Sequence, residues 1–153
     1  MINSKEILAD FIFAGNRVSS FSLDTKDVGT KGVKIKLAYD FDFTTKYLEK
    51  TEEEYIGTIE FLVSVKAKIK KSILFKIDLK MEGLFFGNPG RLAEETFIDM
   101  LELNGVATLS QLARAYIMSV TALSGINPPV KLPMINVVAL RDKKKRNEKK
   151  TQG

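Results

Sequence analysis

Apolar residues recur at every second position along three stretches of this chain, and a shorter, less regular stretch near the N-terminus does the same. An alternation with a period of two sends successive side chains to opposite faces of a strand. The pattern therefore predicts four strands, over residues 11–23, 33–43, 55–69 and 72–86. A sheet with one apolar face is typically antiparallel, and another layer has to cover that face.

The links between these strands carry turn signals and two irregularities. The alternation of the first strand breaks near Gly15 or Ser19, which a β-bulge would explain. Residues 24–32 are predicted to form a turn, and the lysines at 70–71 form the tip of a hairpin. Residues 44–54 lose the alternation and gather charge. They predict a connection over the surface that crosses from one side of the sheet to the other.

Beyond the Gly-Asn-Pro-Gly sequence that ends the fourth strand, the hydrophobic period becomes that of a helix. Apolar residues at 92–101 predict a short helix that ends near residue 105. Thr108 and Gln111 have the spacing of a capping box, so a longer helix is expected to begin there. Gly125 should end that helix.

The longer helix is apolar on two sides. One apolar face should pack on the sheet, and it consists of Leu109, Leu112, Ala113, Tyr116, Ile117, Val120 and Leu123. Ala115, Met118 and Ala122 fall on nearly the opposite side, and Arg114 is the only charge in the helix. Because a helix with so little polar surface should be covered twice, we expect these three residues to contact a partner subunit. The alternative is an exposed helix face on a monomer.

The C-terminal part of the chain begins with a segment that cannot be helical. Three prolines exclude a helix from residues 126–133. Asn136 is expected to cap a last helix that begins near Val137. That helix should give way to lysine-rich sequence, so residues 1–140 are interpreted as one domain and residues 141–153 as a basic, disordered tail.

Composition argues against several classes of function. A chain of 153 residues, with 44% hydrophobic and 28% charged residues, suits one globular domain. No apolar run can span a bilayer, so we expect neither a membrane span nor a signal peptide. Cysteine and histidine are absent, which removes disulfides, thiolate chemistry and the commonest general base. Asp40 and Asp42 are interpreted as polar-face residues, and no phosphate loop stands out, so we expect no enzyme, no metal and no cofactor.

The net charge of +5 comes from the end of the chain. Residues 141–153 carry seven basic and two acidic residues, and the rest of the chain carries 17 of each sign. Three interpretations remain open: a solubilising end, a contact with nucleic acid or an anionic membrane surface, or docking to an acidic protein. No aromatic residue lies among the lysines, so stacking on bases is not expected.

The order of strands, short helix, long helix, proline-rich loop and last helix resembles the SecB family of export chaperones and their SecB-like relatives. The hairpin that ends in residues 82–86 resembles the final strand of the family. Residues 109–117 resemble its long-helix motif, and residues 132–136 resemble its entry into the last helix. The resemblance implies an α+β fold, in which two to three C-terminal helices cover one face of a four-stranded antiparallel sheet. It also implies dimers that pair into a homotetramer in the cytoplasm.

The resemblance further implies an ATP-independent holdase that keeps unfolded or nascent client proteins soluble in hydrophobic grooves. The groove candidates on this chain are Phe41, Phe43, Tyr47, Leu48, Ile126, Pro129, Val130 and Leu132. Phe41 and Phe43 also continue the core face of a strand, so burial inside the subunit is their alternative. Ile126, Val130 and Leu132 are the better candidates, because they lie on a loop that is not expected to hide deeply.

Narrower functions are also open. Export members of the family carry an acidic surface and tail that favour docking to the secretion motor, whereas this tail is basic. SecB-like relatives outside protein transport serve as dedicated chaperones of an antitoxin, and this chain could serve one such partner. A hypothesis from another class is a nucleic-acid-associated scaffold that acts through the tail.

Overall fold

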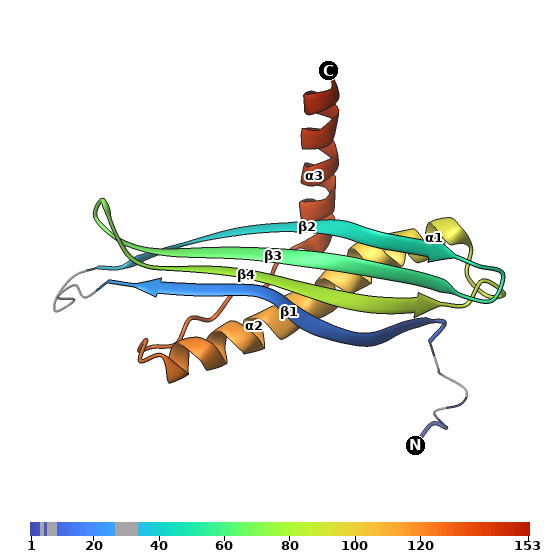
Figure 1. The fold of residues 1–153 in the computed structure, drawn as a ribbon, viewed down its shortest axis with the longest axis horizontal. Helices are drawn as coiled ribbons and strands as arrows, with labels where there is room; N and C mark the ends of the chain where they lie inside the picture. The colour runs from blue at the N-terminus through green and yellow to red at the C-terminus, as the bar shows by residue number, and fades with distance from the viewer. Residues whose placement is uncertain (4, 6–8, 27–33) are drawn as a thin grey trace.

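A computed structural model describes residues 1–3, 5, 9–26 and 34–153. Its fold is α+β, with a four-stranded antiparallel sheet and helices on one face, as predicted (Figure 1). The sheet order is β1-β4-β3-β2, so β1 and β2 form its edges. The strands are β1 (Phe11–Thr25), β2 (Lys36–Lys50), β3 (Tyr55–Ile69) and β4 (Ser72–Gly87). Most of the predicted turn at 24–32, and the predicted start of the second strand at Val33, lie outside the described residues.

Bulges account for the irregular stretches. In β1, the register against β4 shifts between Phe13 and Gly15 and again between Val18 and Ser20, which confirms the predicted irregularity. The prediction of a crossing connection at 44–54 is wrong, because β2 stays paired with β3 as far as Lys50. One extra residue between Thr45 and Tyr47 shifts the β2 register, so the alternation reverses its phase there.

The covering layer begins with one continuous helical rod. It consists of α1 (Glu94–Met100), the π-helical segment η2 (Leu101–Gly105) and α2 (Val106–Leu123). The predicted helix break near residue 105 and the capping box at Thr108 and Gln111 are both wrong. Gly105 has helical angles, φ −61° and ψ −50°, and the Thr108 hydroxyl donates to the Asn104 carbonyl oxygen at 2.8 Å. Backbone amides near Thr108 therefore lie inside the rod and need no cap.

The core lies between this rod and the odd-numbered face of β3 and β4. The fully buried helix residues, with 0% exposure, are Phe97, Leu101, Val106, Leu109, Ala113, Ile117 and Thr121. Glycines in the sheet let the rod approach closely. A Cβ atom at Gly87 would lie 2.5 Å from the ring of Phe97, and one at Gly57 would lie 2.6 Å from Leu101. Ordinary side chains at these two positions would therefore push the rod away from the sheet.

The proline-rich loop returns across the helix face of the sheet (Figure 1). Val130 and Leu132 are each only 2% exposed and belong to the core. The prediction that this loop cannot hide deeply is therefore wrong. The buried backbone amide of Val130 donates to the Thr121 hydroxyl at 2.9 Å, which removes the need for water at that amide.

The last helix, α3 (Val137–Gln152), begins where the sequence predicts. The Asn136 side chain accepts a hydrogen bond from the amide of Ala139 at 3.0 Å. The prediction of a disordered tail from residue 141 is wrong, because the helix continues to Gln152 and stands away from the sheet beside β2 (Figure 1). Ion pairs with the body hold its first half, and lysine and arginine are good helix formers. No helix of the described residues is long and apolar enough to cross a membrane.

Candidate functional site

A groove of about 520 Å³ opens where the proline-rich loop meets one end of the sheet. We call it the proline-loop groove. Its sheet wall comes from the end of β1 and the starts of β2 and β4, and its other wall is the loop. The lining residues are Thr25, Lys26, Ile35, Leu37, Leu74, Phe75 and residues 124–130.

The groove exposes apolar side chains because the helical layer stops short of this end of the sheet. Ile35 is 41% exposed and Leu37 is 42% exposed. Leu37 lies opposite Ala67 in the β2–β3 ladder, and Ala67 lies opposite Phe75 in the β3–β4 ladder. Ala67 itself is fully buried, whereas Leu37 and Phe75 on either side of it line the groove. Such a surface suits the apolar side chains of a peptide.

Three of the predicted client-binding residues line this groove. Ile126 is half-buried and Pro129 is exposed, whereas Val130 lies deep in the groove wall and is nearly inaccessible. Leu132 lies in the core and is not a lining residue. Sequence reasoning missed Ile35, Leu37 and Leu74, although the alternation that includes Ile35 and Leu37 was visible.

The four predicted client-binding residues on β2 do not line the proline-loop groove. Phe41 stacks on the Phe61 ring, with centroids 6.0 Å apart. Phe43 is 4% exposed and has the Lys144 ammonium 5.1 Å from its ring centroid. Phe43 fits the alternative interpretation, burial in the subunit. Phe41 is half-buried and lines a hollow between β2 and α3.

The bulge in β2 places the other two candidates on opposite faces of the sheet. Tyr47 lies across from Thr58 on the polar face, where its hydroxyl donates to the Glu49 carboxylate at 2.6 Å. This hydrogen bond raises the pKa of Tyr47. Leu48 lies across from Gly57 on the helix face and packs against the core. A single groove that includes both side chains is therefore not formed.

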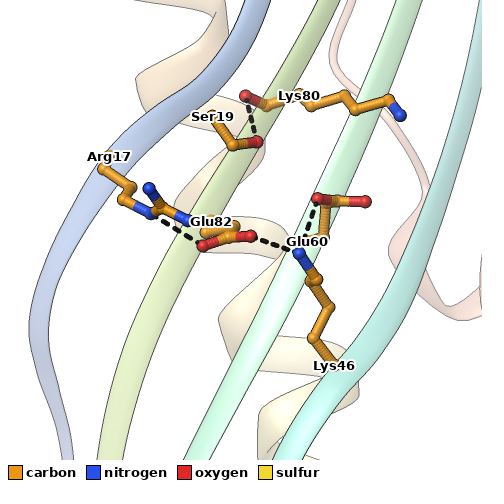
Figure 2. Close-up of polar contacts among 6 residues, drawn as sticks. All are labelled: Arg17, Ser19, Lys46, Glu60, Lys80 and Glu82. Atoms are coloured by element: carbon orange, nitrogen blue, oxygen red, sulfur yellow. Dashed lines mark hydrogen bonds and ion pairs between the residues drawn. The ribbon is translucent and has the colours of Figure 1, made fainter.

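The polar face carries a charged network that links β1, β4, β3 and β2 (Figure 2). Glu82 is 8% exposed, and its carboxylate accepts hydrogen bonds from Lys46 Nζ at 2.6 Å and from Arg17 Nε at 2.8 Å. Lys46 also lies 3.4 Å from Glu60. The bonds from Lys46 and Arg17 lower the pKa of Glu82, and the carboxylates raise the pKa of Lys46. A carboxylate that two cations hold in its ionised form links the strands of the sheet, and it is poorly suited to act as a general acid.

The outer side of α2 is uncovered in the single chain. Ala115, Met118 and Ala122 are exposed there, with Met118 at 42%. Leu123 was predicted on the sheet-facing side but is 89% exposed at the end of the helix, and the polar Thr121 is buried instead. Among the described residues, no group of three or more acidic side chains could hold a metal ion.

This architecture is similar to that of known protein structures. No protein-family model matches the chain, and no curated protein does. Among solved structures, a SecB-like chaperone of Mycobacterium tuberculosis, in complex with a peptide from the HigA1 antitoxin, matches with a TM-score of 0.59. The two chains are 14% identical, and the match covers 83% of this chain and 91% of the other. The fold is SecB-like.

A protein of unknown function from Streptococcus agalactiae is also similar, with 13% identity and a TM-score of 0.47. That match covers 80% of this chain and 96% of the other. In this chain, the proline-loop groove lies between the sheet and the loop that follows α2. This is the same loop on which the sequence predicted client contacts.

Proposed function

We propose that this protein is a SecB-like chaperone that binds apolar segments of unfolded or partly folded client proteins without ATP. The observation that carries the proposal is the proline-loop groove, with Ile35 and Leu37 each about two-fifths exposed along one rim. The fold supports it, because a solved structure with the same fold is a SecB-like chaperone in complex with an antitoxin peptide. A chaperone that acts in protein export, or one that binds a single dedicated client, would perform a narrower form of the same activity.

The chemistry of the groove suits weak and unspecific binding. Each apolar side chain that a client buries contributes about 1.5–3 kcal/mol before the cost of ordering the peptide. Among the described residues, Lys26 is the only charged one that lines the groove, so charge on these residues selects little among client segments. Several such grooves in one assembly would add avidity without sequence specificity.

Replacing Ile35 and Leu37 together with serine should weaken binding of an unfolded model client at least about tenfold, because two anchors are lost. Both side chains are partly exposed, so the fold should survive. Fluorescence anisotropy of a labelled client, with circular dichroism as the check on folding, measures this. The matched control replaces Ile12 and Leu84 with serine. These residues lie outside the groove and are 53% and 36% exposed. Equal losses from both double variants would show that the groove is not the client site.

The uncovered side of α2 supports self-association, and we infer a tetramer formed from two dimers. Light scattering should give about four times the chain mass of 17.1 kDa. Replacing Ala115 and Met118 together with glutamate should lower that mass, because charges would be buried at the contact. The control variant, Ile12→Glu, changes a residue that is 53% exposed on the face of the sheet away from α2 and should leave the mass unchanged. A wild-type monomer at micromolar concentration would contradict this assembly.

A further inference from the structure

Helix α3 has two sides with different surroundings. The first side faces the body: Arg141 Nη1 lies 3.1 Å from an Asp99 carboxylate oxygen, and Lys144 Nζ lies 2.8 Å from one of Asp42. The Arg141 side chain is 17% exposed and that of Lys144 is 25% exposed. These cations are already used to hold the helix on β2 and α1.

The other side of α3 carries cations that face solvent. At 100° per residue, Lys143, Arg146 and Lys150 fall within about 60° of one another, and Lys149 lies beside them. Asp142 falls between Arg146 and Lys149, so this side carries four cations and one carboxylate. All four residues are exposed, and no ion pair to any of them occurs among the described residues. Because the helix projects beyond the sheet, a large partner can approach Arg146, Lys149 and Lys150 without contacting the body (Figure 1). Lys143 lies nearer β2, where it lines a hollow with Asp40 and Asp42.

The composition of this side decides what kind of partner fits. Residues 141–153 contain no aromatic or aliphatic side chain that could anchor a protein interface or enter a bilayer. Single-stranded nucleic acid is bound by stacking on aromatic residues, which are absent here. Binding to the phosphate backbone of a duplex requires only a row of cations, because contacts to the backbone provide most of the affinity of unspecific binding.

We propose that the outer side of α3, formed by Lys143, Arg146, Lys149 and Lys150, binds the phosphate backbone of double-stranded nucleic acid without reading its sequence. This activity is separate from client binding, which uses the proline-loop groove at another part of the molecule. It would bring the chaperone close to duplex DNA or RNA and to the proteins bound there. Charge complementarity is the only attraction required, so the binding should be strongly salt-dependent.

The test measures binding of the full-length protein to a short labelled DNA duplex by fluorescence anisotropy, between about 50 and 200 mM salt. Four neutralised phosphates predict a slope of about −3.6 in a plot of log affinity against log salt. Replacing Arg146, Lys149 and Lys150 together with glutamine should reduce the magnitude of that slope by about 2.7. The matched control replaces Lys66, Lys68 and Lys71 on the β3–β4 hairpin with glutamine. This changes the net charge by the same amount and should leave the slope unchanged.

Three results would overturn the proposal. They are no duplex binding at about 50 mM salt, equal losses from both triple variants, and binding to anionic lipid vesicles or polyglutamate but not to the duplex. Client binding by the α3 variant should equal that of the wild type. Failure of duplex binding would therefore leave the proposed chaperone function untouched, and failure of client binding would leave this proposal untouched.

Discussion

Replacing Phe97 with alanine should lower the free energy of unfolding by about 3–5 kcal/mol. Phe97 is completely buried, and its ring centroid lies 5.2 Å from that of Tyr55 and 5.6 Å from that of Phe11. Across from the ring, Gly57 and Gly87 have no side chains that could move into the space left behind. Since the cost of such a cavity depends on how far its walls collapse, we expect a value near the top of this range.

Denaturant unfolding of the wild type and the variant measures this loss. Phe97→Leu is the matched control and should cost less, because leucine keeps most of the apolar contact. Adding Gly87→Ala to Phe97→Ala should recover part of the stability, since its methyl group would enter the vacated space. A loss below about 1 kcal/mol for Phe97→Ala would show that the rod is not fixed to the sheet by this residue.

The sheet was largely predictable because its alternation is strict where one face is buried. β3 and β4 bury nearly every odd-numbered residue, and the hairpin between them turns at Lys70 and Lys71 as expected. The alternation failed as a guide in β2, where Lys46 is an extra residue in the ladder. A bulge reverses the phase without ending the strand, so a sequence with one bulge looks like a strand followed by a loop.

The helical layer shows a second limit of local signals. Asn104 and Gly105 are typical of a helix end, yet the chain continues through them as a π-helical segment. Burial explains the outcome, because Gly105 packs near the Phe85 ring, 3.4 Å from the position that a Cβ atom would take. Packing against the sheet thus outweighed a local preference of about 1 kcal/mol for ending the helix at glycine.

The candidate site was predictable in part. The sequence analysis singled out the loop through Ile126 and Pro129, and both residues line the proline-loop groove. Its partners on the sheet were sought in β2 after Phe41, whereas the groove uses Ile35 and Leu37 at the start of that strand. Alternation identifies which side chains face the helices, but it does not show where the helical layer ends. That boundary depends on the path of α2 across the sheet, which only the folded chain defines.

The path of the loop depends on a buried hydroxyl that no sequence pattern indicated. Thr121 is fully buried, and its hydroxyl donates to the Ile117 carbonyl oxygen at 2.7 Å while it accepts from the Val130 amide at 2.9 Å. A polar residue on the sheet-facing side of α2 would ordinarily be unfavourable. Here it accepts a hydrogen bond from the Val130 amide, which is buried because Val130 enters the core.

Replacing Thr121 with valine should therefore cost about 1–3 kcal/mol, because the Val130 amide would stay buried without an acceptor. Valine has nearly the same shape as threonine, so the loss would report the hydrogen bond and not a cavity. Thr121→Ser is the control, since it keeps the hydroxyl and should retain the exchange protection of the Val130 amide. Hydrogen exchange of that amide should become faster in the valine variant than in the serine variant, because local opening of the loop becomes easier. Equal exchange in both variants would mean that the apolar contacts of Val130 and Leu132 alone hold the loop in the core, and that Thr121 plays no part in shaping the groove.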